Sequence, residues 1–221
     1  MKPLVDLWKI AKASGVLPSE KNIKETMARV GSNKVVLDNK ASTVSFAVSG
    51  MSIDLGGVAK GYATDRAVKI LRDNGVRNAI VDSGGDMYCL GTRYGAGRWM
   101  VGIRHPRDPG RILYKIEIEN EGIDTSGDYE KYFMIDGKRY SHIIDPRTGF
   151  PVGDDVVSAT IIAGDSETSD AYATALCVLG KAGMIIIDKK GLKGVMIRNN
   201  NGAMDVEMSK GLKVNGDTIE K

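Results

Sequence analysis

Residues 112–144 read ILYKIEIENEGIDTSGDYEKYFMIDGKRYSHII, and the fold prediction starts from this stretch. In its first part the side chains of Ile112, Tyr114, Ile116 and Ile118 alternate with their neighbours, which is the two-residue period of a half-buried strand. Further on, an Asp-Gly pair at 136–137 separates two β-prone runs, a pattern typical of a tight hairpin. The stretch therefore predicts antiparallel β structure in the middle of the chain.

Helices and further strands are expected on both sides of this region. Helical spacing and capping residues predict a first helix closed by Gly15, and further helices at residues 20–30, 59–74, 169–179 and 182–189. Short β-prone runs predict strands at residues 34–38, 43–48, 78–82, 87–91, 99–104 and 156–163, and a last hairpin that turns at Asn201-Gly202. In the run 43–48, Val44, Phe46 and Val48 are expected to point inward. The resulting fold class is α+β, with mostly antiparallel sheets and packed helices in a single domain of residues 1–221.

Composition indicates an ordinary globular chain. It has 221 residues, of which 42% are hydrophobic, and a formal net charge of +3, which gives no indication of nucleic-acid binding. Cys89 and Cys177 stand in apolar contexts without metal or redox spacing, so both are expected to be buried thiols. The chain shows neither an apolar run of membrane-spanning length nor a signal-peptide pattern at its start.

The sequence DLGGVAKG at residues 54–61 is the first candidate site. A strand ends at Asp54, two glycines turn the chain, and a helix begins with Lys60 in its first turn. Glycines allow a ligand to approach the backbone closely, and a helix N-terminus offers N–H groups to an anion. The alternative is a plain turn between two elements.

The sequence SDAYAT at residues 169–174 is the second candidate site. Asp170 and Thr174 are one helical turn apart and would share a face. A carboxylate and a hydroxyl in this arrangement can supply hard oxygen ligands to magnesium or calcium. The alternative is an aspartate that stabilises the start of a helix, with a threonine that only packs.

The sequence SHIIDPRTGFPV at residues 141–152 is the third candidate site. Its prolines and glycine predict a stiff turn beside His142. An imidazole there can donate a hydrogen bond to a phosphate or move a proton near neutral pH, although a purely structural role is the alternative. His105 is expected to be an ordinary loop residue. Thr125 and Ser126, in DTSGDY, could line a nucleotide pocket or satisfy their own turn.

Six strings occur in an order that resembles the ApbE family of FAD:protein FMN transferases. They are PLVDLW, DLGGVAKGYATDRA, VDSGGD, DTSGDY, SHIIDPRTGFPV and SDAYATALCVLG, and they span nearly the whole chain. The resemblance implies an ApbE-like (T-fold-like) domain and an enzyme that uses Mg²⁺ and FAD. It would move FMN from FAD to a Thr or Ser hydroxyl of a target protein, with AMP as the leaving group.

The same resemblance assigns roles to individual residues. Asp54, Lys60 and Ile144 would contact the flavin nucleotide, and His142 would act at the diphosphate. The metal would be bound by the carbonyl of Gly57 and by the side chains of Asp170 and Thr174. There are two alternative functions. One is magnesium-dependent hydrolysis of FAD to FMN and AMP, and the other is FAD binding without catalysis.

The resemblance also implies partners and a compartment. The acceptor would be a flavin-carrying subunit of a membrane redox complex or an extracytoplasmic flavoprotein. Relatives usually carry about a hundred further residues before the PLVDLW helix, some of which contribute to FAD binding, and this segment is expected to be missing here. An extracytoplasmic, membrane-associated location is implied, although this chain shows no signal peptide.

Overall fold

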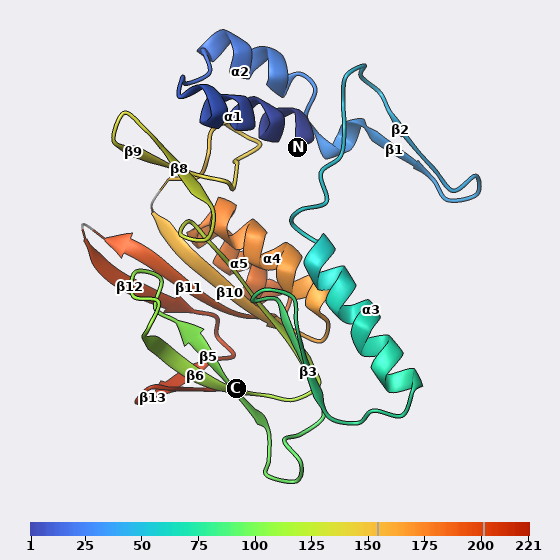
Figure 1. Ribbon diagram of the computed structural model, residues 1–221, viewed down its shortest axis with the longest axis vertical. Helices are drawn as coiled ribbons and strands as arrows, with labels where there is room; N and C mark the ends of the chain where they lie inside the picture. The colour runs from blue at the N-terminus through green and yellow to red at the C-terminus, as the bar shows by residue number, and fades with distance from the viewer. Residues whose placement is uncertain (154, 201) are drawn as a thin grey trace. The chain divides into compact units, whose positions relative to one another are not determined.

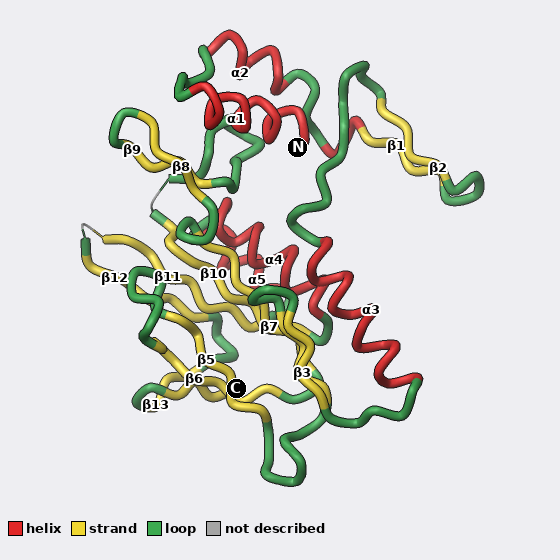
Figure 2. The backbone as a smooth tube through the Cα atoms, viewed as in Figure 1, coloured by secondary structure: helices red, strands yellow, loops and turns green. Residues whose placement is uncertain are grey.

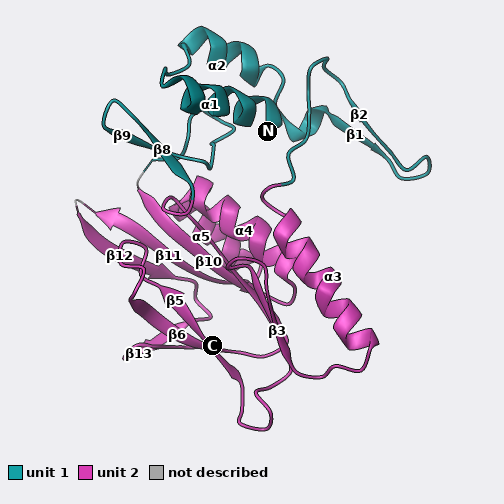
Figure 3. Cartoon of the chain, viewed as in Figure 1, with its two compact units in different colours: residues 1–55, 131–153 teal, residues 56–130, 154–221 magenta. Residues whose placement is uncertain are grey.

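The computed structural model describes residues 1–153, 155–200 and 202–221, which form two compact units (Figure 3). Residues 1–55 and 131–153 make the first unit, and residues 56–130 and 154–221 make the second. The single domain expected from the sequence stays a prediction.

A six-stranded sheet forms the centre of the second unit. Its strand order is β12-β11-β10-β7-β4-β3 and every neighbouring pair is antiparallel. The strands are β3 (Ala79–Asp82), β4 (Met87–Leu90), β7 (Glu121–Gly127), β10 (Val156–Ala163), β11 (Lys193–Asn200) and β12 (Ala203–Met208). All eight residues of β10 are buried, as expected for a strand with neighbours on both edges and both faces covered. The predicted α+β class with mostly antiparallel sheets is confirmed.

A second, four-stranded sheet packs on one face of the first. Its order is β13-β14-β6-β5, with one parallel pair between β14 and β6, and its strands are β5 (Trp99–Arg104), β6 (Ile112–Ile118), β13 (Lys213–Asn215) and β14 (Thr218–Glu220). The contact is a cluster of buried apolar side chains from both sheets, including Ile116, Ile118, Ile123 and Ile162. Burial of this cluster joins the two sheets through the hydrophobic effect.

Helices pack with the six-stranded sheet and with one another in the second unit (Figure 1). They are α3 (Ala59–Asp73), α4 (Ser166–Leu179) and α5 (Lys181–Lys189). Helix α4 contacts β7 and β10 and also packs against α3. It begins three residues before the predicted start, because Asp165 is the N-cap and accepts a hydrogen bond from the Thr168 N–H. Asp170 is therefore in the second turn of the helix.

Helices α1 (Lys2–Ser14) and α2 (Glu20–Met27) belong to the first unit, with hairpins β1–β2 and β8–β9 (Figure 2). Gly15 closes α1 in the left-handed conformation, as predicted. Helix α2 ends before the predicted Val30, since Arg29 and Val30 donate to carbonyls three residues earlier and tighten the last turn. Strands β8 (Tyr132–Ile135) and β9 (Lys138–Ser141) turn at Asp136-Gly137, and both turn residues have positive φ, which confirms the predicted hairpin.

The hairpin of β1 (Val35–Asp38) and β2 (Thr43–Phe46) corrects one prediction. Val44 and Phe46 were expected to point inward, but they are 53% and 39% exposed. Among the described residues these two strands pair only with each other, and their apolar side chains stay exposed. Alternation gave the strand correctly but could not show what packs on its apolar face.

Strand β7 excludes one of two alternatives. Thr125 and Ser126 were expected either to line a nucleotide pocket or to satisfy their own turn, and they lie in an interior strand of the six-stranded sheet, where Thr125 pairs with Thr160 and Ser126 with Ala159. Its small polar side chains lack the alternation of apolar residues by which a strand is recognised in a sequence. The predicted last hairpin is present as β11 and β12, and the turn residue Asn201 lies outside the described residues.

Both cysteines are buried free thiols, which confirms the prediction. Burial raises the pKa of Cys89 to about 11 and that of Cys177 to about 12, so both thiols are protonated near neutral pH. In the part of the chain that the structure describes, none of the helices combines the length and apolar character needed to span a membrane.

Candidate functional site

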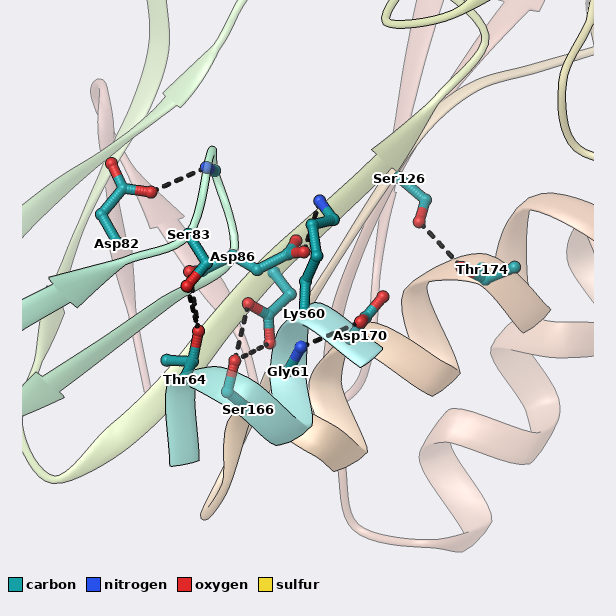
Figure 4. A network of polar contacts seen from close by, with 12 residues as sticks. Lys60, Gly61, Thr64, Asp82, Ser83, Asp86, Ser126, Ser166, Asp170 and Thr174 are labelled. Atoms are coloured by element: carbon teal, nitrogen blue, oxygen red, sulfur yellow. Dashed lines mark hydrogen bonds and ion pairs between the residues drawn. The ribbon is translucent and has the colours of Figure 1, made fainter. Parts of the chain in front are cut away.

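The three predicted metal ligands all lie in the second unit. Figure 4 shows two of them, Asp170 and Thr174, on α4 beside the start of α3 and strand β7. Helix α4 carries Asp170 and Thr174 one turn apart. A Cβ built on Gly57 would lie 3.6 Å from Thr174 Oγ1, so the glycine backbone runs directly beside that hydroxyl. Ser126 Oγ, from β7, is 3.1 Å from Thr174 Oγ1. Gly57 and α4 are therefore neighbours, although more than a hundred residues separate them in the sequence.

Asp170 is fixed in position by a buried hydrogen bond. Its side chain is 4% exposed, and Oδ2 accepts a bond of 3.1 Å from the Gly61 N–H in the first turn of α3. A carboxylate that receives a helix N-terminal N–H group is stabilised by both the bond and the helix dipole. One oxygen of Asp170 thus holds the helix start, and the carboxylate keeps its second oxygen as a possible metal ligand.

Two glycines let α3 and β7 approach the start of α4 at backbone distance. A Cβ on Gly61 would lie 2.3 Å from the Ser166 carbonyl oxygen, and a Cβ on Gly122 would lie 2.7 Å from Ser166 Cα. No other residue type could occupy either position without moving the backbone. The close approach also lets Asp65 of α3 accept bonds of 2.8 Å from the N–H groups of Ser166 and Glu167. These contacts set where α4 presents Asp170.

Lys60 is paired with a carboxylate that the sequence analysis missed. Its ammonium forms an ion pair with Asp86, which is 2% exposed and follows the glycine pair of VDSGGD. Burial alone would lower the pKa of Lys60, but the bond to Asp86 and the nearby charges of Glu130 and Asp170 outweigh it, and the pKa is raised. Burial raises the pKa of Asp86 in spite of the pairing with Lys60. The predicted mobile cation is thus part of an ordered pair.

Asp124 is a second buried carboxyl behind the site. It is fully buried in β7, and it accepts hydrogen bonds of 3.0 Å from Ser166 and a short one from Ser169. Burial raises its pKa to about 8, with further contributions from the charges of Asp86 and Asp170. Asp124 therefore ties the first turns of α4 to the sheet. No signal in the sequence indicated this role, because the partners of Asp124 lie more than 40 residues further along the chain.

The His142 loop belongs to the first unit, where it is held by helix α1. Trp8 donates from its indole N–H to the Gly149 carbonyl over 2.8 Å. A Cβ on Gly149, whose φ is +80°, would lie 2.6 Å from an Ile23 methyl group. The turn is closed by a bond of 2.8 Å from the Gly149 N–H to the Asp145 carbonyl. The stiff turn predicted from the prolines and glycine is present.

His142 itself is exposed, and its ring is oriented by the backbone. Nδ1 is 2.9 Å from the Lys131 carbonyl oxygen, which can only accept a hydrogen bond. The proton of the neutral ring is therefore assigned to Nδ1, and Nε2 carries the lone pair. This arrangement suits an imidazole that accepts a proton at Nε2. The catalytic role of His142 stays a prediction.

The two remaining predicted contacts, Asp54 and Ile144, also lie in the first unit. Asp54 is exposed, and its charge acts on the Met1 amino group, whose pKa is lowered mainly by burial. Ile144 is 5% exposed and packs in the core with Leu4 and Trp8, which leaves little of its side chain for a flavin.

The donor set in the second unit fits a hard divalent cation. A glycine carbonyl, a carboxylate and a hydroxyl are the oxygen ligands that Mg²⁺ prefers, and the surrounding carboxylates of Asp86, Asp170 and Glu130 outnumber Lys60. Among the described residues no cluster of three or more His, Cys, Asp or Glu side chains could hold a metal. A cation here would therefore depend on the carbonyl, the hydroxyl and its substrate for its remaining ligands.

A cavity of about 550 Å³ in the same unit is lined by the Gly84-Gly85 turn, Thr125 and Glu130. The turn itself is closed by a bond of 2.7 Å from the Gly85 N–H to Asp82. Thr125 lines this cavity, and Thr125 and Ser126 both lie in strand β7, so the alternative of a turn does not apply. That these residues line a nucleotide pocket stays a prediction.

The chain resembles known proteins over nearly its whole length. The model of a family described as the ApbE family matches residues 1–196. An FAD:protein FMN transferase of Klebsiella pneumoniae is 36% identical over 179 residues, which cover 80% of this chain and 55% of the relative. The enzyme of the same name from Treponema pallidum is 40% identical over 190 residues, which cover 80% of this chain and 52% of the relative. The chain thus spans about half the length of these curated relatives.

Solved structures agree with this. The ApbE protein of Thermotoga maritima superposes with a TM-score of 0.85 at 35% identity, over 95% of this chain and 68% of the other. The flavin transferase ApbE of Vibrio cholerae gives a TM-score of 0.83 at 31% identity, over 94% and 67% of the two chains.

Proposed function

Because the chain belongs to the ApbE family, we propose that it is a magnesium-dependent FAD:protein FMN transferase. In the proposed reaction the oxygen of a Thr or Ser hydroxyl on the acceptor forms a bond to the phosphorus of the FMN half of FAD. The bond from that phosphorus to the bridging oxygen breaks, and AMP leaves with this oxygen. The proton of the acceptor hydroxyl goes to His142.

The proximity of Gly57 to the Asp170–Thr174 face of α4 carries the proposal. The Gly57 carbonyl and the side chains of Asp170 and Thr174 would hold Mg²⁺, in agreement with the approach of Gly57 to Thr174 Oγ1. When bound, the ion neutralises charge that develops on the diphosphate and on the leaving AMP. The chain's own contribution is to fix the ligands, which it does through the Gly61 bond to Asp170 and the Ser126 contact of Thr174.

The role of His142 is supported by the tautomer that the Lys131 carbonyl selects. A lone pair on Nε2 at the surface of a stiff loop can accept the acceptor's proton, and a fixed loop spares the entropy of ordering it during the reaction. Lys60 and Asp54 would bind the flavin nucleotide. Lys60 would do so from its ion pair with Asp86, whose carboxylate holds the ammonium in place.

The proposal extends to partners and location. The acceptor would be a flavin-carrying subunit of a membrane redox complex or an extracytoplasmic flavoprotein, and the protein would act outside the cytoplasm at a membrane. Substrate and acceptor identity both depend on the transferase activity itself, so that activity is tested first.

The test is flavinylation of an acceptor protein with FAD and Mg²⁺, read by the mass of covalent FMN, in the wild type and in Asp170→Asn. The amide keeps an oxygen for the Gly61 N–H, whereas alanine would leave this buried donor without a partner at a cost of about 1–3 kcal/mol. Asparagine therefore removes the charge with little change in the fold. Glu167→Gln, an exposed carboxylate on the same helix, is the matched control.

Loss of about a hundredfold or more in Asp170→Asn, with normal activity in Glu167→Gln, is the expected outcome. AMP release is measured in parallel without acceptor. Equal AMP release with and without acceptor, and no FMN mass on any acceptor, would identify an FAD hydrolase instead. FAD binding with no AMP release under either condition would leave a binding protein without catalysis.

A further inference from the structure

A small pocket in the first unit is lined by one face of α1, by β8 and by the His142 loop. Val5, Trp8, Lys9 and Lys12 face it from α1, at a spacing that places them on one side of the helix. Its volume is about 210 Å³, which is below the roughly 300–1,000 Å³ of sites that enclose a small-molecule ligand. The pocket therefore has room for one side chain and not for a dinucleotide.

The interior of this pocket is apolar and aromatic. Trp8, which is 3% exposed, lies at a ring-centroid distance of 6.4 Å from Phe133, and the Phe133 ring stacks on Tyr140 at 5.6 Å. Ile144 completes the apolar lining. Rings packed in this way form a rigid surface, and an apolar side chain that enters would be removed from water without reordering the protein.

The rim of the pocket is positively charged. Lys9, Lys12 and Lys131 all line it, and its lining includes no carboxylate. In the described part of the chain none of these three lysines forms an ion pair with an acidic side chain. Three ammonium groups without acidic partners beside an apolar interior are complementary to an acidic partner that carries an apolar anchor.

His142 lines the same pocket. A chain segment seated here would pass next to the imidazole to which the proposed reaction delivers the acceptor's proton. We propose that this pocket is where the acceptor protein docks. The acceptor would be an extended segment that inserts one apolar side chain beside Trp8, places Asp or Glu residues against the lysines, and brings its Thr or Ser hydroxyl to His142. This inference rests on the proposed transferase activity for the identity of the partner.

The docking is tested by fluorescence anisotropy with labelled synthetic peptides, without FAD, so that binding is read independently of transfer. One peptide has a threonine and a leucine flanked by aspartates, and a second has lysines in place of the aspartates. The double variant Lys9→Glu/Lys12→Glu reverses the charge at exposed positions of α1, one of them, Lys12, in the last turn of the helix. Lys24→Glu/Lys40→Glu makes the same change in charge at exposed positions of the same unit outside the pocket.

The acidic peptide should bind the wild type and the Lys24→Glu/Lys40→Glu control with equal affinity. Its affinity for Lys9→Glu/Lys12→Glu should be lower by about tenfold or more. Its affinity should fall as salt is added, because the ion pairs are exposed. Equal binding of the two peptides, no binding of the acidic peptide, or equal affinity for both double variants would overturn the proposal. So would competitive displacement of the peptide by inorganic pyrophosphate, since the lysines would then form a nucleotide phosphate site.

Flavinylation of the acidic peptide is then measured with FAD and Mg²⁺. A higher KM with little change in kcat in Lys9→Glu/Lys12→Glu supports docking at this pocket. Normal KM in that variant refutes it while leaving the transferase proposal intact. Charge-dependent binding of the peptide without any FMN transfer would support the docking proposal and refute the proposed transferase activity.

Discussion

Replacing Asp124 with asparagine should remove a pH dependence of stability that this buried carboxyl imposes on the folded chain. The side chain is fully buried between β7 and α4, and burial raises its pKa to about 8. In the unfolded chain the same carboxyl has the ordinary pKa of an aspartate, about 3.9. Between these two values the folded state holds a proton that the unfolded state has lost.

The sign and size of the effect follow from proton linkage. Because the folded state binds more protons in this window, the free energy of unfolding falls as pH rises from about 4 to about 8 and is level above that. Each pH unit is worth about 1.4 kcal/mol, so the loss between pH 4 and pH 7 is roughly 4 kcal/mol. That is a large part of the roughly 5–15 kcal/mol that stabilises an ordinary domain.

Asparagine keeps the size of the side chain and can exchange hydrogen bonds with Ser166 and Ser169, but it does not titrate in this range. The assay is urea unfolding followed by circular dichroism at several pH values from 5 to 8, with EDTA present so that cation binding adds no pH dependence of its own. Wild type should lose stability across this range, and the difference between it and Asp124→Asn should change by about 1.4 kcal/mol per pH unit. Glu167→Gln, an exposed carboxylate on α4, is the control and should follow the wild type.

Parallel pH profiles for the wild type and Asp124→Asn would refute the reasoning, because they would mean that the carboxyl titrates alike in the folded and unfolded chain. A rise of wild-type stability with pH that Asp124→Asn removes would show that the two serine hydrogen bonds stabilise the charged form more strongly than burial disfavours it.

Two glycine substitutions test the close approaches in the structure. Gly61→Ala should destabilise the fold by several kcal/mol (about 2–4) in thermal unfolding, and lower activity with it, because the new methyl group would meet the Ser166 carbonyl at 2.3 Å. Gly149→Ala combines a positive φ with a 2.6 Å contact to Ile23, and should loosen the His142 loop, which limited proteolysis of that loop would detect. Gly164→Ala, whose Cβ would meet open space, should leave both measurements unchanged, and a Gly61 or Gly149 variant that behaves like it would contradict the packing described above.

Much of the fold could be predicted from local pattern. Alternation along residues 112–118 and the Asp-Gly pair at 136–137 gave a strand and a hairpin, since both depend on interactions between near neighbours in the chain. Strand β7 could not be predicted in this way. Its Asp124, Thr125 and Ser126 are tolerated inside a sheet only because hydroxyls from α4 and β10 reach them, and those partners lie 35 or more residues further along the chain.

In the candidate site, too, local features could be predicted from the sequence and long-range contacts could not. Helical spacing placed Asp170 and Thr174 on one face as possible oxygen ligands, and the prolines and glycine predicted a stiff turn beside His142, because helical periodicity and the restrictions of proline and glycine are local properties. The metal-ligand roles of Asp170, Thr174 and the Gly57 carbonyl come from the family resemblance and stay predictions. The pairing of Lys60 with Asp86, the bond from Gly61 to Asp170 and the burial of Asp124 were decided only by tertiary structure. Each requires two segments distant in the sequence to meet out of water, and a charge gains its partner, and its altered pKa, only when the folded chain has brought the two together.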